Sequence, residues 1–195
     1  MRKYAFWIVL GIILLIVVGG YNGLISSREN VAKAWANVET AYQRRADLIP
    51  NLVNIVQGAA DFEKATLESV TQARASATSI RLDANDLTPE KLQEYQQAQS
   101  KLSGALGRLL AVAENYPQLK AVQGFLDLQA QLEGTENRIN EARRQFNEAA
   151  QSYNVSRQRF PRVILANLFG FKGKPYFESD KGSEKAPAVS FPTQK

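Results

Sequence analysis

The most constraining feature of the sequence is an uncharged run over residues 4–27, bounded by Arg2, Lys3 and Arg28. Nearly all of its residues are apolar, and aromatic side chains lie near both ends, where the two membrane interfaces favour them. A helix needs about 20 such residues to cross ~30 Å of hydrocarbon, so this run is long enough to span a bilayer. The sequence therefore predicts an uncleaved transmembrane anchor at residues 1–27.

Two other interpretations of this run are open. Residues 1–3 also form a short basic leader, and Val18-Gly19-Gly20 resembles the small-residue cleavage site of a signal peptide. A buried core helix would need a matching apolar surface downstream, but the rest of the chain is rich in Lys, Arg, Glu and Gln. Bases flank the two ends of the run almost equally, so the positive-inside rule only weakly favours a body outside the cytoplasm.

The amino-acid composition excludes most kinds of catalytic site. The 195 residues include no His and no Cys, which excludes thiolate nucleophiles, disulfides, the usual general base and zinc sites built on these ligands. Glu133, Glu136 and Glu141 share a predicted helix and could hold a hard cation, but a solvated helix face explains them better. We predict a protein that is not an enzyme and that uses no cofactor or metal.

The basic excess is confined to the last part of the chain. Residues 138–185 carry ten bases and five acids, which accounts for the net charge of +5. No recognisable nucleic-acid motif accompanies these bases, and anionic lipid is the natural counter-charge beside a membrane anchor. We expect membrane lipid as a partner and no nucleic acid.

Apolar residues at helical spacing predict a helical body at residues 28–160. Thr88-Pro89-Glu90 is typical of a helix start, and helices are expected to end or kink at Pro50 and Pro117. One repeat places large residues at every seventh position: Phe125, Leu132, Ile139, Phe146, Tyr153 and Phe160. The predicted fold is all-α, an N-terminal transmembrane helix followed by an antiparallel up-and-down four-helix bundle with coiled-coil-like packing. Helices fused across the two prolines into one long hairpin are the alternative.

Both arrangements return the chain to the membrane at residues 161–177, a segment that is apolar and basic. We predict that it lies on the bilayer surface beside the anchor, and the alternative is that it folds back to cap the bundle. The residues expected to touch the membrane are Arg162, Ile164, Leu165, Leu168, Phe169, Phe171, Lys172 and Lys174. Residues 178–195 are rich in Pro, Ser, Lys and Glu, which predicts a disordered tail.

Several motifs lie at characteristic positions along the chain. They are Tyr21-Asn22, RRADLIPNL at residues 44–52, ENYPQL at 114–119, residues 136–147 with Ala142-Arg143, and Phe160-Pro161 followed by Gly170-Phe171 and Tyr176-Phe177. Together they resemble the LemA family of bacterial membrane proteins, over all but the extreme C-terminus. The resemblance implies an N-terminal transmembrane helix on a four-helix bundle, with no established activity and no assigned catalytic residues. It also implies a cell-membrane location.

Arg44, Arg45, Asp47 and Pro50 match the strongest motif of that family. We expect them to form either a salt-bridged turn between two helices or a contact for a partner. Gly19 and Gly23 have the spacing that lets membrane helices pair, so a homo-oligomer is a further expectation.

The functional expectation is a non-enzymatic, membrane-anchored helical scaffold or adaptor that binds other membrane-associated proteins, the lipid surface, or both. The alternative is a ligand-sensing helical bundle, which would have to act laterally on other membrane proteins because only three residues precede the span. A hydrolase that uses carboxylates and a metal is the least supported class.

Overall fold

The structure, a computed structural model, describes residues 2–59 and 62–178. Every regular element within these ranges is a helix, so the all-helical prediction is confirmed. The helices are α1 (Arg2–Gln57), α2 (Lys64–Ser79), α3 (Pro89–Ala113), α4 (Pro117–Lys120), α5 (Gln123–Gln158) and α6 (Arg162–Leu168). Apart from Glu178, the tail predicted to be disordered lies outside the described residues.

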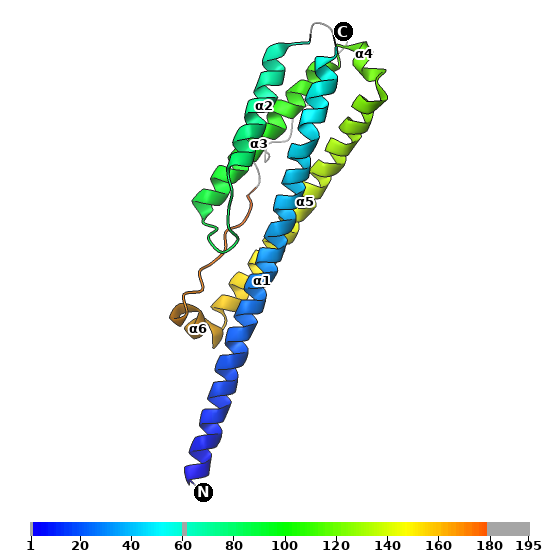
Figure 1. Cartoon of the computed structure of the whole chain (residues 1–195). Coiled ribbons are helices and arrows are strands. Elements are labelled where there is room, and N and C mark those ends of the chain that lie inside the picture. Colours follow the sequence, from blue (N-terminus) through cyan, green and yellow to red (C-terminus); the bar gives the residue numbers. More distant parts are fainter. Residues whose placement is uncertain (1, 60–61, 179–195) are drawn as a thin grey trace, which may run out of the picture.

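Helix α1 begins in the apolar run and continues into the body without a break (Figure 1). It is long and apolar enough to span a membrane, and its most apolar stretch is only 11 % buried. Side chains such as Trp7 and Leu15 are 66 % and 73 % exposed. The interpretation as a buried core helix is therefore wrong, and these side chains need an apolar surrounding that the rest of the chain does not supply.

The expected turn at Asp47 and Pro50 is absent, because α1 runs through Pro50 to Gln57. Proline has no N–H and leaves the carbonyl four residues earlier, that of Ala46, without its helical partner. Arg74 of α2 supplies the missing donor, with its Nε 2.8 Å from the Ala46 oxygen. A hydrogen bond between helices thus replaces the one that proline removes within α1.

The other predicted boundaries are close to those observed. Helix α3 begins at Pro89, with the Thr88 hydroxyl accepting a hydrogen bond from the N–H of Lys91 at 3.3 Å. The helix is interrupted near Pro117 as expected. Helix α3 ends before this residue, and only the short α4 lies between α3 and α5. The seven-residue repeat in α5 is buried from Phe125 to Tyr153, whereas Phe160 lies beyond the helix and is 82 % exposed.

The long helices pack as two antiparallel pairs (Figure 1). Helix α5 runs back along α1, α2 and α3 form a second hairpin, and α2 also contacts α1. The apolar core is divided into two clusters. The cluster nearer the N-terminal apolar run contains Trp35, Tyr95 and Phe146, and the distal one is built around residues such as Leu52 and Leu109.

Candidate functional site

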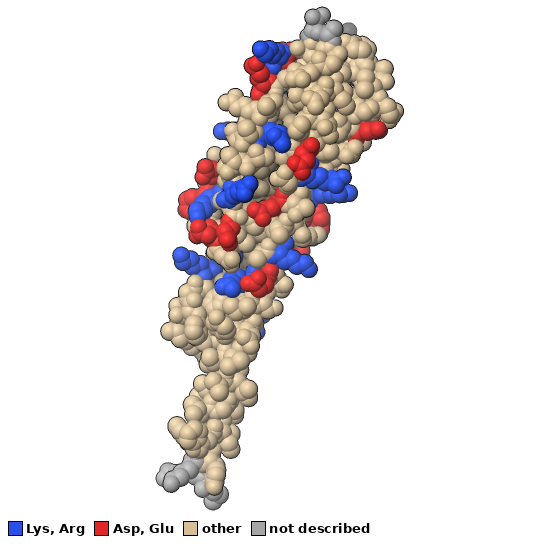
Figure 2. Space-filling model, in the orientation of Figure 1, with Lys and Arg blue, Asp and Glu red and all other residues tan. Residues whose placement is uncertain are grey.

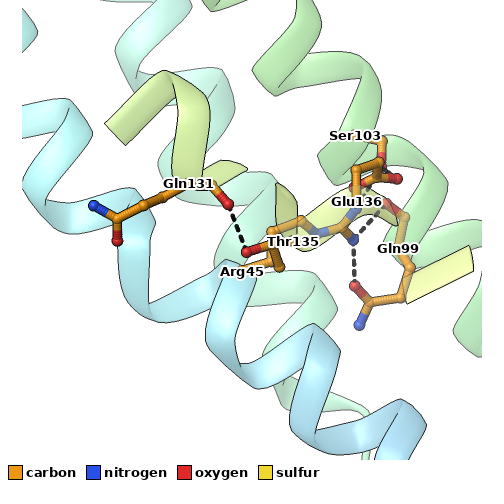
Figure 3. Close-up of polar contacts among 6 residues, drawn as sticks. All are labelled: Arg45, Gln99, Ser103, Gln131, Thr135 and Glu136. Carbon is orange, nitrogen blue, oxygen red and sulfur yellow. Dashed lines mark hydrogen bonds and ion pairs between the residues drawn. The ribbon is translucent and has the colours of Figure 1, made fainter. Parts of the chain in front are cut away.

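A layer of polar side chains separates the two apolar clusters, and Arg45 lies at its centre (Figure 3). The Arg45 side chain is only 1 % exposed. Its guanidinium donates to Gln99 Oε1 at 2.7 Å and to the Gln99 carbonyl at 3.2 Å. It also donates to Ser103 Oγ at 2.5 Å and to Glu136 Oε2 at 3.0 Å. We call these four residues the polar layer.

The polar layer connects all four long helices. Arg45 comes from α1, Gln99 and Ser103 from α3, and Glu136 from α5. The Gln99 amide then reaches α2, because its Nε2 donates to the Ala77 carbonyl at 3.3 Å. A buried charge destabilises a fold unless it is paired and hydrogen-bonded. Here the Glu136 carboxylate and three neutral oxygens bind the two terminal nitrogens of Arg45, whereas its buried Nε has no acceptor among the described residues.

The chemistry of the polar layer fits a structural role, in which it holds the helices together as a tie. A guanidinium stays protonated at any relevant pH, so it cannot act as a base. Glu136, its acidic partner, is held in the ion pair. No group of three or more potential metal-ligating side chains occurs in the part of the chain that the structure describes.

Arg44, Asp47 and Pro50, the other residues singled out in the motif at 44–50, point away from the core, whereas Ala46 and Ile49 are buried in it. Arg44, Asp47 and Pro50 are exposed on α1, and Asp47 accepts a hydrogen bond from Gln43 at 2.7 Å. Arg44 and Asp47 line an open groove of about 700 Å³ together with Glu39. The motif is therefore divided between Arg45, which holds the interior together, and an outer face that is free to contact other molecules.

The predicted membrane-contact residues also divide into two sets. Leu165, Phe171 and Lys174 are buried against the rest of the chain, so they do not form the outer surface of this segment. Arg162 is half-buried and donates to Ser156 Oγ at 2.7 Å. The other set is exposed and comprises Ile164, Leu168, Phe169 and Lys172. The segment thus both packs on the body, as the capping alternative expected, and presents apolar side chains outward.

Helix α6 packs on α1 where two glycines permit a close approach. A Cβ atom added at Gly20 would lie 2.8 Å from Leu165 Cδ1, and one at Gly23 would lie 3.0 Å from an Arg162 nitrogen. Nothing lies within 4 Å of the same position at Gly19. Of the two glycines proposed for helix pairing, Gly23 is therefore covered by α6 of the same chain.

After α6 the chain runs back along the body as an extended segment, residues 171–178, which we call the C-terminal strap (Figure 1). Two asparagines of α5 hold its backbone. Asn154 accepts from the Lys174 N–H at 2.9 Å and donates to the Lys174 carbonyl at 2.8 Å. Asn147 pairs in the same way with Phe177, at 2.8 and 3.0 Å. Neither asparagine was predicted from the sequence, because their seven-residue spacing places both on one face of α5 but does not reveal the segment that they bind.

The strap joins the two helix pairs. The ring of Phe177 stacks on Trp35 of α1 at a centroid distance of 6.1 Å and meets Phe146 of α5 edge-on at 5.4 Å. Lys174 extends to the loop between α2 and α3, where its ammonium donates to the carbonyls of Ala84 and Asn85 at 2.5 and 3.2 Å. Burial lowers the pKa of Lys174, and the nearby charge of Arg28 adds to this effect.

The family assignment rests on a match that includes the polar layer and the strap. The model of the LemA family matches residues 34–191. The chain belongs to the LemA family. The match begins within α1, after the apolar run, so the features that define the family lie in the helical body.

Curated relatives of this LemA-family chain include magnetosome proteins and a protein named LemA. Magnetosome protein MamQ 1 of Paramagnetospirillum magneticum and magnetosome protein MamQ of Magnetospirillum gryphiswaldense are each 28 % identical to it over 187 residues, covering 87 % of this chain and 68 % of theirs. Protein LemA of Metamycoplasma hominis is 27 % identical over 149 residues, covering 76 % of this chain and 64 % of its own.

We predict that Arg45→Ala destabilises the body far more than Arg44→Ala. Loss of the buried guanidinium leaves Gln99, Ser103 and Glu136 without their donor, at a cost of about 2–4 kcal/mol. The exposed neighbour should change the free energy of unfolding by no more than ~0.5 kcal/mol. Urea unfolding of the full chain in mild detergent, followed by circular dichroism, measures both. Equal effects would show that the polar layer is not a stabilising tie.

We predict that Asn154→Ala releases the strap near Lys174 and that Asn147→Ala releases it near Phe177. Each change removes a paired set of hydrogen bonds to the backbone of one strap residue, and Asn154→Ala also removes a bond to Tyr176 Oη. Net values of about 1 kcal/mol per bond imply at least a ~10-fold loss of local protection. Hydrogen exchange of the Lys174 and Phe177 backbone amides measures this loss of protection. Asn137→Ala, an exposed change on the same helix, is the control, and uniform loss of protection along α5 would contradict a local clamp.

Proposed function

We propose that this LemA-family chain is a non-enzymatic scaffold, anchored by α1 as a single-pass protein of a bacterial inner membrane. Its four long helices form an antiparallel bundle that presents a rigid surface to other membrane-associated proteins, with the body on the extracytoplasmic side. The observation that carries this proposal is the continuity of α1, whose exposed apolar part leads into the core of the body without a hinge. Such a helix holds the body at a fixed height above the bilayer.

A second apolar surface beside the anchor supports the proposal. Phe160, Ile164, Leu168 and Phe169 are 82 %, 57 %, 73 % and 54 % exposed, and we call them the α6 patch. Phe169 meets Tyr21 of α1 edge-on at a centroid distance of 5.0 Å, so the patch adjoins the apolar part of the anchor. Figure 2 shows charged side chains over the body and, on the face in view, none on the described part of the stem below it. The α6 patch is therefore suited to rest in the interfacial region of the bilayer.

The outer face of the motif at 44–50 is the part of the body best suited to a partner. Arg44 and Asp47 are exposed, oppositely charged and set beside an open groove, and the fold does not require either side chain for its own packing. Arginine is enriched in protein interfaces, and exposed charges at their rim favour complementary partners.

The alternative of a ligand-sensing bundle has one observation in its favour. A cavity of about 810 Å³ lies between α1, α2 and α3 and is lined by charged groups that include Glu39, Arg74 and Arg81. Burial raises the pKa of the Glu39 carboxyl. A polar small molecule bound there would contact Tyr95 and Gln99, and thereby the polar layer. A ligand-dependent change in hydrogen exchange of α2 relative to α5 would favour this alternative.

We predict that the α6 patch enters the lipid interface. The Cys-free chain allows a single Asn167→Cys variant to carry an environment-sensitive fluorophore on α6, and Ser69→Cys on α2 is the matched control. In proteoliposomes the α6 label should be blue-shifted and quenched by spin-labelled lipid, and the α2 label should not. Ile164→Asp with Leu168→Asp should return the α6 label to water, because charged side chains resist transfer from water. Equal solvent exposure at both labels would refute the membrane contact.

We predict that Arg44→Ala with Asp47→Ala reduces the recovery of partner proteins from native membranes and leaves the thermal stability unchanged. Both side chains are exposed, so their loss removes surface contacts without disturbing the core. Quantitative affinity purification compares this variant with Lys101→Ala, a change at another exposed base. If the unmodified chain recovers only itself, the scaffold proposal fails.

A further inference from the structure

A small pocket lies where the strap leaves α6 and passes α1. Its volume is about 370 Å³, and its walls come from α1, α5, the loop before α3 and the strap. Three bases line it, Arg28, Lys172 and Lys174. No carboxylate is among its lining side chains within the described residues. We call it the basic pocket.

The bases of the basic pocket are only partly neutralised. The Lys174 ammonium is bound by two carbonyl oxygens rather than by an acid. Arg28 contacts Glu29 at 3.3 Å, yet its Nε is buried and has no hydrogen-bond acceptor among the described residues. Asp83 and Asp86 lie close enough to favour the charged form of Lys174, but Asp86 is itself paired with Lys91.

A second guanidinium beside the pocket, that of Arg157, is likewise only partly hydrogen-bonded. Arg157 donates to the Phe171 carbonyl at 3.2 Å, and its Nε is also buried without an acceptor in the described part of the chain. Cations held together in a partly buried site repel one another unless an anion lies between them. The pocket therefore has the electrostatic character of an anion site whose counter-charge comes from another molecule.

The position of the pocket identifies the source of that anion. Tyr21 and Phe169 form its apolar wall, and both belong to the surfaces that the proposed function places at the bilayer, the end of the apolar run and the α6 patch. A phosphate held by the bases would leave room for acyl chains to pass along the exposed apolar side chains of α1. Basic pockets at this level of a membrane protein suit anionic lipid headgroups.

We propose that the basic pocket binds the phosphate of one anionic phospholipid, held by Arg28, Lys172 and Lys174, with the acyl chains beside α1 and α6. This inference rests on the proposed function in that it places residues 21 and 169 at the bilayer interface. The bound lipid would fix α6, the strap and the loop before α3 to one another, because each of these segments contributes to the pocket.

The test measures lipid binding to the full chain in detergent by native mass spectrometry, with phosphatidylglycerol and phosphatidylcholine of equal chain length. The unmodified chain should retain one phosphatidylglycerol in preference to phosphatidylcholine. Arg28→Gln with Lys172→Gln should weaken this binding roughly 30-fold, since each base near the headgroup contributes about fivefold. Lys101→Gln with Arg138→Gln removes the same charge from exposed sites on α3 and α5 and should leave binding unchanged.

Lys172→Gln alone is a second variant that keeps the fold intact, because the Lys172 side chain is exposed and its carbonyl still accepts from Tyr153 Oη at 2.8 Å. It should reduce binding severalfold. Equal binding of the two lipids, or equal losses in the pocket and control variants, would overturn the proposal. Displacement of the lipid by millimolar inorganic phosphate would also overturn it, in favour of a soluble anion. Carbonate extraction of native membranes tests the anchor separately, because binding in detergent does not require a membrane span.

Discussion

Helix α1 is one unbroken helix with an exposed apolar first part and a second part that is packed inside the body. The arrangement of the other helices depends on this continuity. Its first part exposes apolar side chains such as Trp7 on all sides, while its second part is packed by α2 and α5. Pro50 would normally interrupt such a helix. The fold keeps the helix continuous because Arg74 donates to the Ala46 carbonyl that proline leaves unpaired. The position of α2 is thereby coupled to the integrity of α1.

The polar layer fixes how the helices align along this axis. An apolar core alone tolerates sliding of one helix along another, since leucines and valines pack in many registers. Arg45 reaches its partners on α3 and α5 only in one register, and Gln99 extends the same constraint to α2. Buried ionic groups add little net stability but can specify one arrangement among several. We attribute that role to Arg45.

The sequence predicted those elements whose pattern is local and missed those that depend on contacts between elements. The cap at Thr88, the break at Pro117 and the buried heptads of α5 follow from spacing alone and were found. Two arrangements were expected at Pro50, the start of a new helix or a continuing helix, and the structure shows the continuing helix. The sequence did not decide between them, because nothing near Pro50 reveals that Arg74 compensates for the missing N–H. Arg45 lies seven residues after Val38, so its inward orientation was readable from the heptad, although its partners were not.

The strap could not have been predicted from the chain's own periodicity, yet its geometry is simple. Seven residues of helix advance by ~10.5 Å, and three residues of extended chain advance by ~10 Å. Asn147 and Asn154 therefore meet every third residue of a segment that runs antiparallel to α5, at Phe177 and Lys174. The match places the aromatic ring of Phe177 in the core and the ammonium of Lys174 on the loop before α3 at the same time. One short segment thus couples α6 to both helix pairs, so a displacement of α6 would be transmitted to the body through backbone contacts rather than through a flexible linker.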